Sequence, residues 1–110
     1  MDTTPNPISR KNDALRRTFM GGRIVLTDSV RQSDNLKEIL HAVKTFDNFT
    51  PDNDLYNEHD FGKFTINSTD YFFKIDYYDE NYEYYKKDGN RVMTIMRAEE
   101  YWGVMNYSYK

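Results

Sequence analysis

Apolar residues recur every three or four positions between residues 34 and 47, which is the spacing of a helix that buries one face. They are Leu36, Ile39, Leu40, Val43 and Phe46. Ser33 or Asp34 is a suitable N-cap, because either side chain can accept a hydrogen bond from an unpaired N–H of the first turn. Thr50-Pro51 stops any continuation, since the residue before a proline avoids the helical conformation.

A second, shorter helix is predicted over residues 10–20. Leu15 and Phe19 are spaced i, i+4 and would share its buried face. Ser9 is the predicted N-cap. Gly21-Gly22 would end the helix, because glycine adopts the left-handed conformation of a terminating residue without steric cost.

Strict alternation of apolar and polar residues predicts strands in the second half of the chain. Phe61–Ile66 and Tyr71–Tyr78 alternate in this way and are joined by a polar turn, so they form a predicted hairpin. One face of the second strand would carry Tyr71, Phe73, Ile75 and Tyr77, and the other Phe72, Lys74, Asp76 and Tyr78. Arg23–Thr27 and Arg91–Arg97 are two further predicted strands, because both are rich in β-branched and other apolar residues.

These elements predict an α+β fold in which two helices pack on a mainly antiparallel sheet of about four strands. The chain has 110 residues, the length of one domain. Residues 1–8 contain two prolines and little apolar content, so we expect a flexible lead-in followed by a single domain over residues 9–110. Residues 98–110 are predicted to form a short helix and a closing strand.

Composition excludes several classes of site and protein. The chain has no cysteine, which rules out disulfides, thiolate metal sites and cysteine nucleophiles. No apolar run approaches the roughly 20 residues of a membrane span, and the first residues lack the pattern of a signal peptide. We therefore expect a cytoplasmic protein without membrane association, and the sequence leaves the oligomeric state unknown.

Charge is distributed unevenly along the chain. Residues 1–31 carry six basic and three acidic side chains, whereas residues 46–90 carry eleven acidic and four basic ones. A basic cluster lies on the helix predicted over residues 10–20 and comprises Arg10, Lys11, Arg16 and Arg17. Contact with nucleic acid is one interpretation, and a solvated helix face is the other. The overall acidity and the lack of an RNA-binding motif argue against direct nucleic-acid binding.

An acidic segment over residues 46–62 contains no basic side chain and a histidine between two carboxylates. Carboxylate oxygens suit Mg²⁺, Ca²⁺ or Mn²⁺. The candidate ligands are Asp52, Asp54, Glu58 and Asp60. The glycine and terminal glutamate of a calcium loop are out of register, and His59 would point away from its neighbours unless the chain bends. Alternatively, these side chains accept hydrogen bonds from backbone N–H groups of a structural loop. We favour this interpretation, and we expect no cofactor.

A catalytic alternative extends this cluster to the hairpin. A metal-dependent nuclease or hydrolase would use Glu58, His59, Asp60 and Asp76. Lys74 would support the attacking water, but it precedes Asp76, whereas the usual order in such sites is an acid followed by a lysine. The competing interpretation is a Lys74–Asp76 ion pair at a solvent-facing edge, which would contribute little to stability.

Five tyrosines and four acids, with no basic residue, fill the stretch from Asp76 to Tyr85. Rigid amphipathic tyrosine rings are enriched at protein interfaces, and acidic groups can imitate the charge of DNA. The candidate partner-binding residues are Tyr78, Asp79, Glu80, Tyr82, Glu83, Tyr84 and Tyr85. The alternative is a polar loop whose tyrosines lie flat over the core.

The chain also resembles an uncharacterised family of small alphaproteobacterial proteins, a numbered domain of unknown function that is frequent on plasmids and other mobile elements. The matching stretches are Asn12-Asp13, Leu15-Arg16-Arg17, Gly22-Arg23 with Thr27, Phe46-Asp47-Asn48-Phe49-Thr50, Asp52-Asn53-Asp54, Glu58-His59-Asp60-Phe61-Gly62, Lys74-Ile75-Asp76-Tyr77-Tyr78-Asp79, and Arg91 with Thr94-Ile95-Met96. The chain departs from the family pattern at Leu55 and Asn57, where Pro and Gly are expected, and this puts the tightness of the loop in question.

The resemblance implies no activity, cofactor or catalytic residue, but it implies mobile-element or phage biology, in which small domains often bind and inhibit another protein. The sequence therefore predicts a binding protein that acts on a protein partner, such as a nucleic-acid-processing or defence complex, through its acidic tyrosine-rich surface. An inhibitor of the anti-CRISPR type is the concrete form of this hypothesis. The metal-dependent nuclease or hydrolase is the alternative.

Overall fold

The computed structural model of the chain describes residues 6–106, which form a four-stranded sheet with helices on both faces. In chain order the elements are α1 (Pro7–Thr18), β1 (Arg23–Leu26), α2 (Asp28–Arg31), α3 (Leu36–Thr45), β2 (Phe61–Ile66), β3 (Thr69–Tyr78), β4 (Asn90–Arg97), the 3-10 helix η1 (Ala98–Glu100) and α4 (Tyr101–Asn106). The predicted α+β class is confirmed. The predicted closing strand falls beyond α4, outside the described residues.

The sheet is mixed, because one of its edge strands runs parallel to its neighbour. The strand order is β1-β4-β3-β2, in which β2 and β3 form the predicted antiparallel hairpin and β3 and β4 are also antiparallel. β1 lies parallel to β4, with Arg23 opposite Val92 and Leu26 opposite Ile95. A parallel pair requires a crossover connection, and here the chain passes through two helices and two other strands before β4 joins β1.

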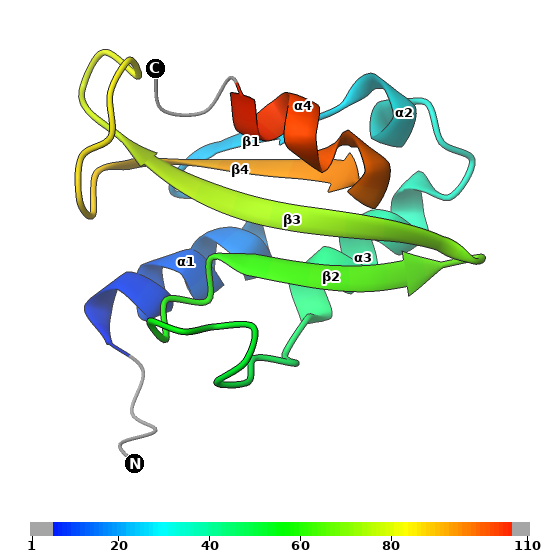
Figure 1. Ribbon diagram of the computed structural model, residues 1–110, viewed down its shortest axis with the longest axis horizontal. Helices are drawn as coiled ribbons and strands as arrows, with labels where there is room; N and C mark the ends of the chain where they lie inside the picture. The colour runs from blue at the N-terminus through cyan, green and yellow to red at the C-terminus, as the bar shows by residue number, and fades with distance from the viewer. Residues whose placement is uncertain (1–5, 107–110) are drawn as a thin grey trace.

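Helices α1 and α3 cover one face of the sheet, and η1 and α4 lie against the other (Figure 1). The core is buried between the sheet and the first pair of helices and comprises Leu15, Val30, Ile39, Val43, Tyr71, Phe73, Ile75, Tyr77, Met93 and Ile95. On the opposite face the Tyr101 ring packs edge-on against Phe61 and Phe72, at centroid distances of 5.9 and 5.4 Å. The alternation predicted for β3 therefore places its first set of side chains in the main core.

The ends of α1 differ from the prediction. Asn6 caps the helix, since its Oδ1 accepts the N–H of Ser9 at 2.7 Å, and Pro7 occupies the first helical position. Proline is favoured there because its missing N–H would have been unpaired anyway. At the other end Phe19, rather than glycine, adopts the left-handed conformation with φ 59°. The predicted cap at Ser9 is therefore wrong by three residues, and the predicted stop at Gly21-Gly22 is wrong by two.

The helix predicted over residues 34–47 is shorter than expected, and a further helix precedes it. α3 begins at Leu36 and ends at Thr45, because Phe46 is already extended with φ −62° and ψ 130°. The short helix α2 was not predicted, and it places Val30 in the core. A four-residue helix shows too little periodicity to be recognised from a sequence.

Candidate functional site

The acidic segment forms an irregular loop between α3 and β2, residues 46–60, which we call the acidic loop. Asp54 Oδ1 accepts the backbone N–H groups of Glu58 and His59 at 3.0 and 3.1 Å. Asn53 accepts the N–H of Thr50 and donates from its amide to the loop backbone. The carboxylate and amide side chains thus satisfy backbone groups of the loop, which is the structural role that the sequence allows for them.

His59 packs into the protein, and its side chain is largely buried. Its backbone is left-handed, with φ 58°, so the chain bends at this residue. The ring stacks on Phe49 at a centroid distance of 4.0 Å and an interplanar angle of 3°. Nδ1 lies 3.0 Å from Asp13 Oδ1, and Nε2 lies 3.5 Å from Asp54 Oδ2. His59 therefore ties the loop to α1.

Arg16 is fully buried behind this histidine, so the basic cluster predicted on the surface of α1 is not intact. Its guanidinium donates to Asp13 Oδ1 at 2.8 Å and to the carbonyl of Val43 at 3.2 Å. It also lies 5.3 Å from the centroid of the Phe49 ring, within cation–π range. A carboxylate shared between Arg16 and His59 thereby joins α1, α3 and the acidic loop.

A chain of hydrogen bonds links Glu58 through β3 and α1 to the start of β4. The Tyr77 hydroxyl donates to Glu58 Oε1 at 2.8 Å and accepts from the Asn12 amide at 2.8 Å. Burial raises the pKa of this hydroxyl, which keeps it protonated as a donor. Asn12 Oδ1 accepts from Arg91 Nε at 2.6 Å, and Arg91 also donates to Asp88. Glu58 is thus held by a hydrogen bond from the core residue Tyr77.

Lys74 and Asp76 pair, but they do so inside the protein. Their side chains are 2.6 Å apart, and each residue is only 7 % exposed. The prediction of a pair at a solvent-facing edge is therefore wrong in its location. The second face of β3 is covered where the sequence pattern suggested solvent, and a buried pair is costly to break because it leaves one charge unpaired.

Asp60 is the most perturbed carboxyl of the candidate site. Its own carbonyl accepts the N–H of Ile75 at 2.8 Å, which continues the sheet just before β2. Burial, followed by the negative charges of Glu58, Asp54 and Asp76, raises the pKa of its side chain to about 6. Such a pKa is one mark of functional sites, although structural networks produce it too.

The four candidate metal ligands do not share a site. Asp52 is exposed, Asp54 holds backbone N–H groups, and Glu58 accepts from Tyr77. Within residues 6–106 no three histidine, aspartate or glutamate side chains are placed so that they hold a metal ion. Of the four candidate catalytic residues, Asp60 is influenced by the charges of Glu58 and Asp76, whereas His59 turns to other partners.

The predicted partner-binding residues lie on the connection between β3 and β4, residues 79–89, which we call the tyrosine loop. Asp79 braces it from within, because its Oδ1 accepts the N–H groups of Asn81 and Glu83 at 3.0 and 3.1 Å. The guanidinium carbon of Arg23 lies over the Tyr82 ring, 3.6 Å from the centroid of that ring. Asp79 and Tyr82 therefore hold the loop in place, and the half-buried Tyr78 lies at its base.

The remaining candidates of this loop face solvent. Tyr84 and Tyr85 are 58 % and 55 % exposed. Glu80 pairs with Lys86 at 2.9 Å, and the hydrogen bond from this lysine lowers the pKa of Glu80. Among the described residues, the Glu83 carboxylate forms no ion pair or hydrogen bond. The exposed surface is therefore rich in tyrosine but less acidic than the sequence suggests.

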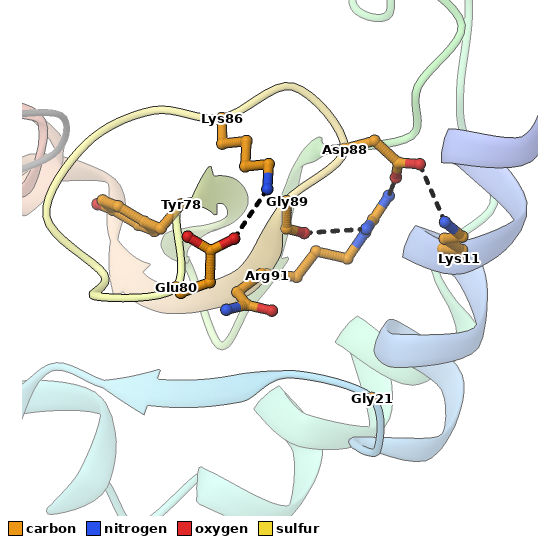
Figure 2. Close-up of a pocket in the computed structure, with 9 residues that line it drawn as sticks. Lys11, Gly21, Tyr78, Glu80, Lys86, Asp88, Gly89 and Arg91 are labelled. Carbon is orange, nitrogen blue, oxygen red and sulfur yellow. Dashed lines mark hydrogen bonds and ion pairs between the residues drawn. The ribbon is translucent and has the colours of Figure 1, made fainter.

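An open depression of about 350 Å³ separates the tyrosine loop from α1 (Figure 2). Asp88 lies between two cations there, with Lys11 Nζ at 2.9 Å and an Arg91 nitrogen at 2.6 Å. The hydrogen bonds from Arg91 and Lys11 lower the pKa of Asp88. These ion pairs connect the base of the loop to α1 and limit its movement.

Sequence reasoning missed the polar residues that α1 and β4 bury. Asn12, Asp13, Arg16 and Arg91 are central to the networks, but hydrophobic periodicity counts only apolar positions. Ser9, Asn12 and Arg16 are spaced as one helix face, so a signal was present in the spacing of polar residues. All four also fall in the stretches that carry the family resemblance.

Comparison with known proteins gives a match to a protein family. A family model described as "Protein of unknown function (DUF3768)" matches residues 26–100. No curated protein and no solved structure matches the chain. The matched range runs from the end of β1 through η1 and contains the acidic and tyrosine loops. None of the helices between residues 6 and 106 is long and apolar enough to cross a membrane.

Proposed function

We propose that this chain, which belongs to the DUF3768 family of proteins of unknown function, is a binding protein that contacts a partner protein through its tyrosine loop. The observation that carries this proposal is the half-exposure of two consecutive tyrosines, Tyr84 and Tyr85, on a braced loop. Tyrosine supplies a large contact area at a low cost in side-chain entropy. A loop already held in one conformation loses little further freedom on binding.

The bracing comes from three directions. Asp79 holds the backbone of the loop from within, and Arg23 of β1 stacks on Tyr82. Asp88 joins the end of the loop to Lys11 of α1. Loops without such contacts are mobile and pay for ordering when they bind. The tyrosine loop is therefore suited to present the same surface in the free and bound states.

The charged side chains of the tyrosine loop limit the kind of partner that it can bind. The pairing of Glu80 with Lys86 and the use of Asp79 inside the loop leave Glu83 as the acidic group next to the tyrosines. This supports recognition mainly through the tyrosine rings, with one nearby carboxylate contributing, more than imitation of the charge of DNA. A nucleic-acid-processing or defence complex, inhibited in the manner of an anti-CRISPR protein, remains our proposal for the partner class. The metal-dependent alternative has no observation in its favour beyond the raised pKa of Asp60.

Affinity capture with matched variants tests the proposal. We expect the tagged wild-type chain to retain a specific protein from a bacterial lysate, and Tyr84→Ser combined with Tyr85→Ser to lose it. Trp102→Ser is the matched control, because Trp102 is another exposed ring, on α4 and 69 % accessible. Equal capture by the tyrosine variant and the wild type, with both folded, would show that this surface is not the binding site.

Charge substitution adds a second test that the structure sharpens. Glu83→Lys changes a carboxylate that supports no other described group, so we expect weaker capture with an unchanged melting temperature. Asp79 is unsuitable for the same test, because its replacement removes two backbone hydrogen bonds and disturbs the loop itself.

A further inference from the structure

The two most exposed large apolar side chains of the described residues are neighbours. Leu55 and Tyr56 are 78 % and 80 % accessible, and both lie in the acidic loop rather than in the tyrosine loop. Single exposed apolar residues are common on protein surfaces and need no explanation. Two adjacent residues exposed to this degree at one loop position form a projecting apolar feature, which we call the Leu-Tyr tip.

The backbone on both sides of the Leu-Tyr tip is fixed by hydrogen bonds. On the N-terminal side the N–H of Asp54 donates to the carbonyl of Thr50 at 2.9 Å. On the C-terminal side the N–H of Asn57 donates to the carbonyl of Asp54 at 3.1 Å. Asp54 then accepts the next two N–H groups of the chain through its side chain, as described above. The exposed pair is therefore enclosed within consecutive closed turns.

Helix α1 anchors the base of the same loop. The Asn6 amide donates to the carbonyl of Asn57 at 2.9 Å, and the Asn12 amide donates to the carbonyl of Glu58 at 2.9 Å. Asn57 is left-handed, with φ 54°, a conformation that asparagine tolerates better than most residues other than glycine. The departure from the family pattern at this position is thus compatible with a tight loop. Most of the ordering cost of presenting the two side chains is met by folding.

The surroundings of the Leu-Tyr tip are acidic. Asp47 and Asp52 are exposed in the same loop, and residues 46–62 contain no lysine or arginine. An anionic membrane surface would repel these carboxylates, which argues against lipid as the occupant. The projecting shape favours insertion into a pocket over enclosure of a small molecule. Complementary charge around such a pocket would steer the encounter and select the partner.

We propose that the Leu-Tyr tip is a docking element that inserts Leu55 and Tyr56 into an apolar pocket of a partner protein rimmed by lysine or arginine side chains. This surface is separate from the tyrosine loop and binds whether or not that loop also contacts a protein. Tyrosine is a frequent hot-spot residue, because it combines a large apolar area with a hydroxyl that hydrogen-bonds at the rim. Leu55 would extend the apolar contact on the same tip.

Site-specific photo-crosslinking tests the chemistry of the pocket. Tyr56→benzoylphenylalanine in the full chain is irradiated in a bacterial lysate, and the crosslinked peptide is identified by mass spectrometry. We expect a peptide with apolar residues next to lysine or arginine. A crosslink to a second copy of this chain overturns the proposal, as does one to an acidic surface. Absence of any crosslink at position 56, when the same group placed at Tyr84 does crosslink, also overturns it.

Affinity measurements with the purified crosslinking protein complete the test. Leu55→Ser combined with Tyr56→Ser is expected to weaken binding by roughly tenfold or more, as truncation of a central apolar contact does. Met20→Ser is the matched control, since Met20 is a similarly exposed apolar side chain elsewhere, and its affinity should equal that of the wild type. Affinity should also fall with rising salt. Unchanged affinity of the Ser variant, with an unchanged melting temperature, refutes docking by this tip.

Discussion

Replacement of Asp60 by asparagine is expected to stabilise the protein at neutral pH. The pKa of this carboxyl rises from 3.8 to about 6 on folding, so the folded chain binds the proton more tightly than the unfolded chain. The free-energy cost of ionisation is therefore absent well below pH 3.8 and complete above about pH 6. Asparagine never ionises, and it keeps an oxygen that accepts a hydrogen bond at the same position.

The magnitude follows from the size of the shift. A change of about two pKa units corresponds to a ceiling of about 3 kcal/mol, at 1.36 kcal/mol per unit. Asp60 is partly accessible to water, which screens the charge, so we expect a gain of about 1–2 kcal/mol in the free energy of unfolding for Asp60→Asn. At about pH 4.5 only about a third of the gain should remain, because that pH lies about a third of the way from the unfolded pKa to the folded pKa and the folded carboxyl is still protonated.

Urea denaturation followed by far-UV circular dichroism measures this difference at both pH values. Asp70→Asn is the control, because hydrogen bonding from Thr65 lowers the pKa of Asp70 and its substitution should give no stabilisation. The reasoning fails if Asp60→Asn is as stable as the wild type, or less stable, at about pH 8. A stabilisation that does not shrink on acidification would trace the gain to packing rather than charge.

Three further predictions use the same denaturation assay. Gly62→Ala should destabilise by about 2–3 kcal/mol, because its methyl group would overlap the Phe73 ring; an unchanged midpoint would contradict this. Asn57→Gly should be neutral to within about 0.5 kcal/mol, whereas Asn57→Val should cost about 1–2 kcal/mol, since a β-branched residue resists a left-handed backbone. Lys74→Met should cost about 3 kcal/mol by stranding the buried Asp76 charge, and adding Asp76→Leu should recover part of the loss; additive losses would argue against the pair.

Hydrophobic spacing predicted the fold well where one face of an element is apolar. The strand Phe61–Ile66 has the predicted bounds, and the alternation in β3 placed Phe73 and Ile75 on one face, which is the face that lies in the core. The parallel pairing of β1 with β4 was not predictable in this way, because periodicity reports the faces of a strand and not its neighbours. The start of α1 was missed because capping depends on one side chain, Asn6, that no periodic pattern contains, and its end was missed because Phe19 adopts the left-handed conformation expected of glycine.

The candidate site was predictable only in part, since its polar groups combine distant segments. The sequence showed that carboxylates cluster around His59, but not that Asp13 of α1 would contact its ring. It suggested an exposed Lys74, whereas the second face of β3 is covered. A buried polar residue is recognised by its partner, and here the partners lie up to 79 positions away, as Arg91 and Asn12 do.

The parallel pairing of β1 with β4 has a consequence for the order of folding. Arg23 pairs with Val92, about 70 residues later in the chain, and contacts at such separations slow folding because a long loop must close first. A nascent chain that has emerged only through β3 lacks the strand that joins β1 to the rest of the sheet. Until β4 is synthesised, β1 has no neighbouring strand to pair with, and its apolar side chains are exposed to chaperones and to aggregation.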